Sequence, residues 1–408
     1  MTRKKELFIP LKDKEILMYV CGITPYDTTH LGHAFTYTFF DVLYRYLIHL
    51  GYKVTYTQNV TDINDRDKDI LKKAHQQHTS WNKLADFWTK KFLEDMKNLN
   101  WVMPTNYLKA SKQITSMIRI IEALLKNGYA YERESNVFLD IKKVKDFGKL
   151  SKLTKEYMLI RAKEFEEDID NPLKKNKLDI TLWRAATPDQ PAHIPSFKSP
   201  FGKGRPASRR GSPGGRPGWH IECSAMAISS LDEQIDIHGG GIDLIYPHHE
   251  SEIAQSESAT GKTPFAKYWI HTGTVLYKGK KMSKSLGNLV MVSDLLKKFS
   301  SDTIRFVLLS HNYSEPWEFR EKELTTAQES LNIIKSALKI KSKKNLPLSS
   351  ENSFKRINES LENNMNTPQA LLKIISLANI ILKENSFKNV ARDQNNLREC
   401  LKILGFTI

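Results

Sequence analysis

The stretch from 16 to 64 constrains the fold more than any other part of the chain. Residues 16–20 (ILMYV) form an uninterrupted apolar run of strand length. A helical pattern follows from about Leu31, and Gly51 stands at its end as a C-cap candidate. Residues 52–64 (YKVTYTQNVTDIN) alternate and are rich in β-branched side chains, which predicts a second strand. Strand, helix and strand in this order predict a βαβ unit with parallel strands and a ligand site at their carboxyl ends.

The pattern after residue 80 predicts that the sheet is interrupted. It is helical to about 135 and then irregular and proline-rich to about 205. Strand-like apolar runs return at 233–241 and 268–277, and the pattern is helical again after about 295. We therefore expect an α/β fold in four segments: the first half of a catalytic domain at 1–95, a mainly helical or irregular insertion at 96–205, the second half at 206–295, and a helical domain at 296–408.

One local repeat stands apart from this pattern. Residues 199–206 (SPFGKGRP) are partly repeated at 212–217 (SPGGRP). Glycine, proline, serine and arginine do not pack a core, so we expect a flexible duplicated loop here.

Length and composition narrow the class of protein. A chain of 408 residues with 40% hydrophobic residues can bury two or three cores, and its three cysteines are too few for a disulfide framework. The first residues lack the apolar segment of a signal peptide, and no apolar run approaches the roughly 20 residues that span a bilayer. We expect a cytoplasmic monomer with reduced thiols and no membrane partner. The net charge of +16 suits a nucleic acid, but the lysines are spread along the chain, as on any solvated surface.

Three short motifs are suited to binding phosphate. Residues 30–33 (HLGH) stand where the first helix begins, so imidazoles and backbone N–H groups meet an anion there. Residues 238–243 (HGGGID) allow close approach of a ligand. Residues 278–288 (KGKKMSKSLGN) form a Gly- and Ser-rich loop with four lysines that suits a polyphosphate. Each alone is compatible with a solvated loop, but together they indicate adenylate chemistry.

A metal site is the second chemical hypothesis. The candidate ligands are Cys21, Cys223, His248 and Glu252. His248 and Glu252 lie four residues apart and share a face if the segment is helical. Two thiolates, one imidazole and one carboxylate are acceptable tetrahedral zinc ligands. The alternative is that the cysteines are ordinary core residues and that the HHE sequence lies on the surface.

The same residues resemble a known family. The segments CGITPYDTTHLGHAFTY, TQNVTDIND, RPGWHIECSAMA, DIHGGGIDLIYPHHESEIAQ and KMSKSLGN occur in the order found in the cysteine-activating branch of class I aminoacyl-tRNA synthetases. HLGH resembles that class's HIGH signature, and KMSKS is its second signature unchanged. The resemblance implies a Rossmann-like catalytic domain split by an insertion and followed by a C-terminal helical bundle.

Two kinds of enzyme share this branch, and they differ in the acceptor. Cysteinyl-tRNA synthetases pass activated cysteine to tRNA, whereas mycothiol ligases pass it to the amine of glucosaminyl-inositol (GlcN-Ins). Pro25, the SPFGKGRP segment, LDITLWRAATPDQP and the short C-terminal region resemble the ligase, so we expect GlcN-Ins as the acceptor, with tRNA as the alternative. Glu252 and its neighbours resemble the synthetase, and the positive charge suits tRNA better than a sugar. Residues 164–169 (EFEEDI) stand where the ligase has an acidic segment containing a glycine pair.

The resemblance also implies roles for individual residues. His30 and His33 would stabilise the α-phosphate in the transition state, and Lys281 and Lys284 the departing pyrophosphate. One Zn²⁺ would be held by Cys21, Cys223, His248 and Glu252, with ATP as substrate and Mg²⁺ beside it. The cysteine and adenylate pocket would be lined by Cys21, Gly22, Ile23, Thr24, Thr36, Asn59, Val60, Thr61, Trp219, Gly241, Ile242, Asp243 and Val275.

Overall fold

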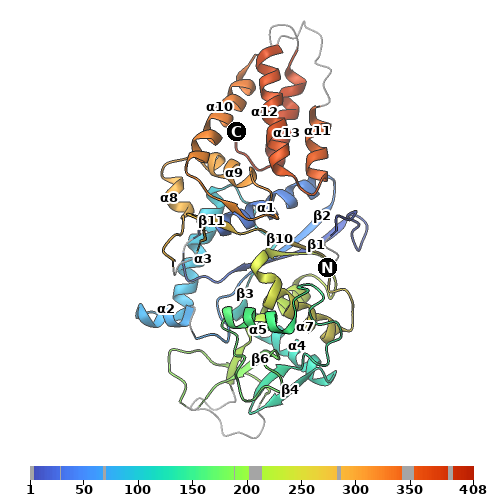
Figure 1. The fold of residues 1–408 in the computed structure, drawn as a ribbon, viewed down its shortest axis with the longest axis vertical. Coiled ribbons are helices and arrows are strands. Elements are labelled where there is room, and N and C mark those ends of the chain that lie inside the picture. Colours follow the sequence, from blue (N-terminus) through green and yellow to red (C-terminus); the bar gives the residue numbers. More distant parts are fainter. Residues whose placement is uncertain are drawn as a thin grey trace.

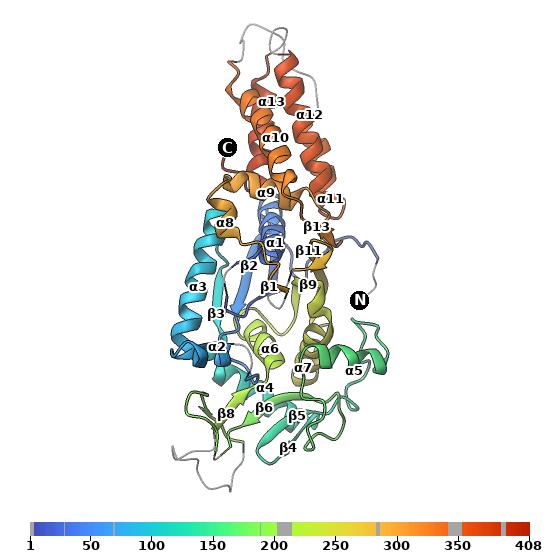
Figure 2. The same ribbon diagram turned by 60° about the vertical axis from the view of Figure 1, so that its left-hand side comes forward.

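The molecule is elongated, and three parts follow one another along its long axis (Figures 1 and 2). C-terminal helices form one end, a parallel sheet lies in the middle, and the inserted segment with a second sheet forms the other end. The computed structural model describes residues 4–27, 29–67, 70–187, 189–201, 214–282, 286–341, 353–384 and 389–408.

The central sheet is parallel throughout. Its strands in spatial order are β10 (Ala266–Thr272), β9 (Ile235–Gly241), β1 (Glu15–Ile23), β2 (Lys53–Val60) and β3 (Asn106–Lys109). Every neighbouring pair is parallel. The order reverses between β1 and β9, so a crevice opens there at the carboxyl ends of the strands. The predicted βαβ unit and Rossmann-like α/β fold are confirmed, whereas β3 falls in a region where we expected only helix.

Strand β1 is covered on both faces, which explains its unbroken apolar run. Met18 and Val20 belong to a core shared with α1 (Leu31–His49) and the C-terminal helices. Tyr19 and Cys21 point the other way, into a core shared with the insertion. Because side chains alternate along a strand, a doubly covered parallel strand needs apolar residues at every position.

Helix α1 starts at the edge of this crevice. His30 is its N-cap, and His30 Nδ1 accepts a hydrogen bond from the Gly32 backbone N–H at 3.0 Å. The helix packs closely on β9, because a Cβ at Gly239 would come within 2.2 Å of the Phe40 ring. The glycine-rich strand end therefore serves helix packing as well as ligand approach.

The insertion contains a second sheet, which corrects our expectation of a mainly helical or irregular segment. Its antiparallel strands in spatial order are β4 (Ala130–Arg133), β5 (Asn136–Leu139), β6 (Ile180–Ala185), β8 (Gly214–Pro217) and β7 (Phe197–Lys198). These strands have six residues or fewer, too short for a period-two pattern to be recognised against the helical segments around them. The accompanying helices are α4 (Ile114–Lys126) and α5 (Lys155–Glu164), with a 3₁₀ turn η1 (Ala110–Lys112).

The second copy of the repeated Gly-Arg-Pro sequence ends in a strand. Residues 202–213 lie outside the described part of the chain, but the end of the second copy forms strand β8. Arg216 is buried there, and its Nη2 lies 2.6 Å from Asp67 Oδ1. The expectation of a flexible loop is wrong for Gly214–Pro217, because strand pairing and an ion pair hold these residues.

The remaining elements complete the catalytic part and the helical end. Around the sheet lie α2 (Ile70–Gln76), α3 (Trp81–Asn98), α6 (Trp219–Ser230), η2 (Ile242–Leu244), η3 (Ile245–His249) and α7 (Glu250–Thr260). A small sheet contains β11 (Val275–Tyr277), β12 (Lys280–Lys281) and β13 (Trp317–Glu318). The C-terminal helices are α8 (Val292–Leu296), α9 (Ser301–Leu309), α10 (Lys322–Lys339), α11 (Ser353–Glu362), α12 (Thr367–Glu384) and α13 (Ala391–Ile403).

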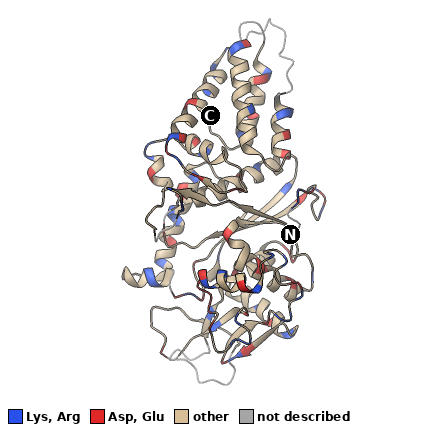
Figure 3. Cartoon of the chain, viewed as in Figure 1, with Lys and Arg blue, Asp and Glu red and all other residues tan. Residues whose placement is uncertain are grey.

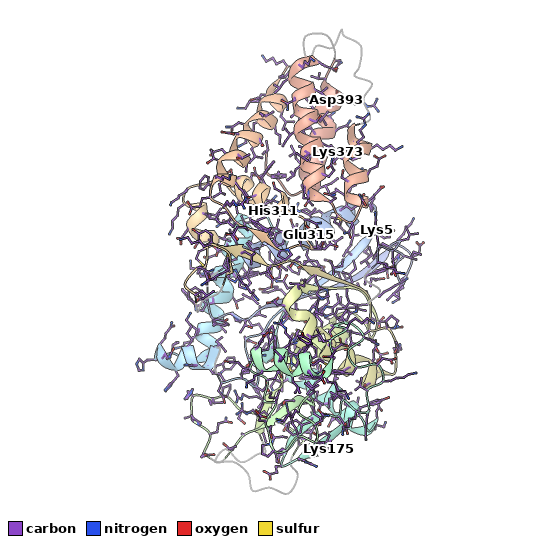
Figure 4. All side chains as sticks on the ribbon, viewed as in Figure 1. Lys5, Lys175, His311, Glu315, Lys373 and Asp393 are labelled. Atoms are coloured by element: carbon purple, nitrogen blue, oxygen red, sulfur yellow. The ribbon has the colours of Figure 1, made fainter. Side chains whose placement is uncertain are left out.

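Buried polar contacts join the helical end to the catalytic sheet. Arg305 of α9 is fully buried and pairs with Asp41 of α1, and its guanidinium also donates to the carbonyl oxygens of Leu99 (3.0 Å) and Leu404 (2.5 Å). Lys5, labelled in Figure 4 beside this end, donates to the Asn363 side chain. The C-terminal helices are thus anchored on α1 rather than linked loosely to it.

Charged residues of both signs are interspersed over the two ends of the molecule (Figure 3). Among the described helices, none combines the length and apolarity needed to cross a membrane.

Candidate active site and metal centre

A cavity of about 410 Å³ opens at the carboxyl ends of the parallel strands. The structure places most of the predicted site residues in its lining, namely Cys21, Gly22, Ile23, Thr24, His30, His33, Thr36, Asn59, Thr61, Trp219, Cys223, Gly241, Ile242, Asp243, His248, Val275 and Lys281. Two predicted residues lie outside the lining: Val60 is buried in the sheet and Glu252 lies behind Cys21. Lys284 lies outside the described residues.

The histidines of the HLGH motif form one end of the cavity. The rings of His30 and His33 are stacked with centroids 3.9 Å apart. Burial lowers the pKa of His30 to about 4, with the positive charge of Lys281 acting in the same direction, and burial with His30 lowers the pKa of His33. Both rings are therefore neutral near pH 7, and each can donate one N–H to a phosphate oxygen.

A lysine of the KMSKS segment lies at the exposed rim of the same end. Lys281 Nζ is 2.8 Å from Oδ2 of Asp243, which is the second residue after the glycine-rich end of β9. This ion pair brings together two motifs separated by 38 positions in the sequence. A cation at this rim is suited to an anionic group that enters the cavity.

Residues at the carboxyl ends of β1 and β2 also line the cavity. The Gly22 N–H donates to Asn59 Oδ1 at 2.8 Å, and Asn59 Nδ2 donates to Thr61 Oγ1 at 3.1 Å. A Cβ at Gly22 would come within 1.5 Å of the Asn59 carbonyl oxygen, so only glycine fits this crossing. The two strand ends are thereby held in a fixed register.

The four predicted metal ligands meet in one cluster, and three of them line the same cavity. Their donor atoms lie within 4.8 Å of one another, and Cys21, Cys223, His248 and Glu252 are all buried. Glu252 Oε1 lies 3.4 Å from Cys21 Sγ and 3.3 Å from His248 Nε2. Ligands of a tetrahedral zinc ion are separated by about 3.3–3.8 Å when the metal–ligand bonds have their usual lengths. The donor set and spacing therefore fit zinc.

Burial supports the same interpretation. It raises the pKa of the Cys21 thiol and of the Glu252 carboxyl well above their ordinary values. Both groups coordinate metals as anions, and a divalent cation is the partner that stabilises closely spaced anions in an apolar interior. The cysteines are core residues, as the alternative held, but they converge on a common point.

Sequence reasoning missed the residues that support this cluster. Glu252 Oε2 lies 2.8 Å from His238 Nε2, and His248 Nδ1 lies 2.8 Å from His220 Nδ1. His220 Nε2 in turn lies 3.1 Å from Glu167 Oε1. The two supporting histidines stand inside the quoted motifs GWHIEC and DIHGGG, but their spacing does not distinguish them from ordinary buried histidines. Further lining residues that were not predicted are Tyr26, Asp27, Gly32, Tyr37, Leu244, Thr272, Gly273, Thr274, Met282 and Leu289.

Solved structures share this architecture. Methionyl-tRNA synthetase of Mycobacterium tuberculosis in complex with methionyl-adenylate superposes with a TM-score of 0.63, at 15% identity over 96% of this chain and 88% of that one. A LeuRS–tRNA–LeuAMS ternary complex from Agrobacterium radiobacter gives a TM-score of 0.67, at 12% identity over 97% and 84%. The fold is therefore that of the class I aminoacyl-tRNA synthetases.

Sequence comparison gives the family within this class. A family model described as tRNA synthetases class I (C), catalytic domain, matches residues 7–329. A cysteine–tRNA ligase of Dehalococcoides mccartyi is 38% identical over 413 aligned positions, covering 100% of this chain and 85% of that protein. One from Thermococcus onnurineus is 43% identical over 338 positions, covering 83% and 66%. The chain belongs to the class I (C) tRNA synthetase family and is an ATP-dependent, amino-acid-activating ligase.

Proposed function

We propose that the protein is a cysteinyl-tRNA synthetase. It joins the carboxylate of L-cysteine to the α-phosphate of ATP, releasing pyrophosphate, and then transfers the cysteinyl group to a ribose hydroxyl at the 3′ end of tRNA, releasing AMP. The observation that carries the proposal is that one cavity is lined both by Cys21, Cys223 and His248 of the metal cluster and by the HLGH histidines. The two groups match the thiol and the adenylate of one intermediate.

The metal cluster would select the amino acid. Cysteine and serine differ in one heteroatom and have nearly the same shape, so an apolar pocket discriminates between them poorly. Zinc would be held by Cys21, Cys223 and His248, with Glu252 as a fourth ligand that the substrate sulfur displaces or supplements, and it would supply a bond to that sulfur which a serine hydroxyl does not replace, because soft metals prefer thiolate. Trp219 stacks on His248 with ring centroids 4.4 Å apart and would keep water from this bond.

The chain's own residues would carry the activation step by alignment and charge. The neutral rings of His30 and His33 donate hydrogen bonds to α-phosphate oxygens as negative charge develops there. Lys281, released from Asp243, and Lys284 would stabilise the departing pyrophosphate, and a bound Mg²⁺ would supply further positive charge there. Thr61 accepts a hydrogen bond from the substrate ammonium beside the strand ends. No side chain acts as a nucleophile, so positioning accounts for the rate enhancement.

The acceptor distinguishes the two enzymes of the branch. The sequence favoured GlcN-Ins, and the comparisons favour tRNA, because the relatives that align along this chain are named cysteine–tRNA ligases. The short C-terminal region does not separate the two, since the Dehalococcoides relative aligns over 100% of this chain and is only modestly longer. The positive charge of +16 then suits a polyanionic acceptor.

Amino-acid-dependent exchange between pyrophosphate and ATP tests the activation half. We expect exchange with cysteine and at least about 10³-fold less with serine at equal concentrations, because serine leaves the metal bond unmade. Removal of zinc with a chelator should abolish the cysteine signal, and added zinc should restore it. Exchange that is equally fast with serine, or that survives complete removal of zinc, would contradict the proposed selection.

A further inference from the structure

A line of buried side chains leads from the metal cluster into the insertion. His248 Nδ1 lies 2.8 Å from His220 Nδ1, and His220 Nε2 lies 3.1 Å from Glu167 Oε1. His220 stands in the first turn of α6, whereas Glu167 follows α5 in the insertion. The His220 and Glu167 side chains are only 3% and 17% exposed, so water competes little for these hydrogen bonds.

The chemistry of the three groups determines where the protons lie. An ionised carboxylate only accepts hydrogen bonds, so the Nε2 atom of His220 must carry the proton that Glu167 accepts. For His248 to offer its Nε2 lone pair to a metal, its proton must lie on Nδ1, so His220 Nδ1 must accept that proton. This leaves the lone pair of His248 on Nε2, the atom that faces Glu252 Oε1 at 3.3 Å within the cluster.

We propose that Glu167 is a positioning residue for the metal centre. By accepting the Nε2 proton of His220, it holds His248 in the tautomer and orientation whose Nε2 lone pair points at the metal. A ligating histidine commonly donates its second N–H directly to a carboxylate or carbonyl, and here a second histidine is interposed. The inference rests on the proposed function, in which the four side chains hold zinc.

A second contact of Glu167 restrains the face of the His248 ring. Arg66 Nη2 lies 3.0 Å from Glu167 Oε1, and the Arg66 guanidinium lies 3.9 Å above the Trp219 ring. Trp219 is stacked on His248. Glu167 therefore restrains His248 at its Nδ1 edge through His220 and on its face through Arg66 and Trp219.

A purely structural role is the competing explanation, because Glu167 also ties the insertion to the catalytic part. Three variants separate the two. Glu167→Ala removes the acceptor, Glu167→Gln removes the charge but keeps an oxygen that accepts from His220, and Glu164→Ala is the matched control. Glu164 is exposed, lies three positions away and pairs only locally, with Arg161 of the same helix.

The experiment measures zinc affinity of each purified full-length variant by competition with a chromophoric chelator, beside the melting temperature of the metal-free protein. We expect Glu167→Ala to weaken zinc binding at least about tenfold, Glu167→Gln to stay within about threefold of wild type, and Glu164→Ala to match wild type. A structural role alone would lower the metal-free melting temperature and leave zinc affinity unchanged.

Three results would overturn the inference: unchanged zinc affinity in Glu167→Ala, an equal loss in Glu167→Gln, or a wild-type protein without zinc affinity. The readout needs neither amino acid nor tRNA. A protein that shows the expected zinc affinities but charges no tRNA would therefore contradict the proposed function separately.

Discussion

Lys281 and Asp243 form an ion pair at the rim of the cavity, with Lys281 Nζ 2.8 Å from Asp243 Oδ2. The side chains are 55% and 38% exposed, so the pair contributes little to folding stability. A cation held so weakly exchanges its partner readily when a more highly charged anion arrives. The ion pair thus keeps Lys281 at the place where the pyrophosphate of ATP would leave.

Substitution of this lysine should affect chemistry and not the metal. We expect Lys281→Ala to lower the rate of cysteine-dependent pyrophosphate exchange about 10²-fold, because a preorganised positive charge on the leaving group is lost. Zinc content should stay at the wild-type value. Lys298→Ala is the control, since Lys298 is exposed, lies outside the KMSKS loop and outside the cavity lining, and it should change the rate less than about twofold. Equal losses in both variants would refute a specific role of Lys281.

The metal cluster predicts a difference between two buried cysteines. Cys223→Ser replaces a proposed ligand with a hydroxyl, so zinc measured by atomic absorption should fall from one ion per chain to well below half. Cys400→Ser alters a buried cysteine in α13, distant from the cluster in sequence and fold, and should keep the zinc. Retention of a full equivalent of zinc in Cys223→Ser would show that this thiol is not a ligand.

The lowered pKa of His30 predicts how stability depends on pH. The unfolded chain binds a proton on this histidine below pH of about 6.5, whereas the folded protein keeps the ring neutral until the pH falls to about 4. Stability is therefore complete above the unfolded pKa and is lost as the pH falls through this window. Between pH 7 and pH 5 the loss from His30 should be about 2 kcal/mol.

The variant His30→Asn tests this contribution. Asparagine is a good N-cap and can still accept the Gly32 N–H, but it does not titrate. Urea unfolding at both pH values should show a decrease about 2 kcal/mol smaller in His30→Asn than in wild type. Parallel decreases would mean that His30 is protonated in the folded protein at pH 5.

The buried Arg305–Asp41 pair predicts a large loss of stability. Asp41→Asn leaves the Arg305 guanidinium buried without a counter-charge, and the free energy of unfolding should drop by about 3–5 kcal/mol. Asp294→Asn is the matched control, because its pair with Lys297 is exposed, and it should change stability by less than about 1 kcal/mol. Denaturant melts of both variants measure the difference. Similar values for the two would refute the anchoring role of Arg305.

The sequence predicted the part of the fold that local patterns determine. The unbroken run before Cys21 identifies a doubly covered strand, and the alternation before Thr61 identifies a second strand. Because the two strands are parallel neighbours, their carboxyl ends meet. The short strands of the insertion have no such signature. Arg216 in β8 shows why, since its burial depends on Asp67, an ion-pair partner 149 residues away.

In the candidate site, too, the sequence predicted the residues that lie in local motifs and missed those whose role depends on long-range contacts. Residues in recognisable motifs, such as His30 and Lys281, were placed in advance, and the structure gathers them in one cavity. Glu167 was noted only as part of an acidic segment, because its importance lies in the hydrogen bond to His220, which no spacing reveals. The roles of all these residues stay predictions until they are measured.

Transfer of labelled cysteine to the two possible acceptors tests the central proposal most directly. Purified protein with ATP, Mg²⁺ and [³⁵S]cysteine would be given either tRNA transcripts with a cysteine anticodon or GlcN-Ins, and product and AMP release would be measured. We predict label on tRNA and AMP release that depends on tRNA, with no product from GlcN-Ins. AMP release and a labelled product with GlcN-Ins alone would contradict the assignment as a cysteinyl-tRNA synthetase.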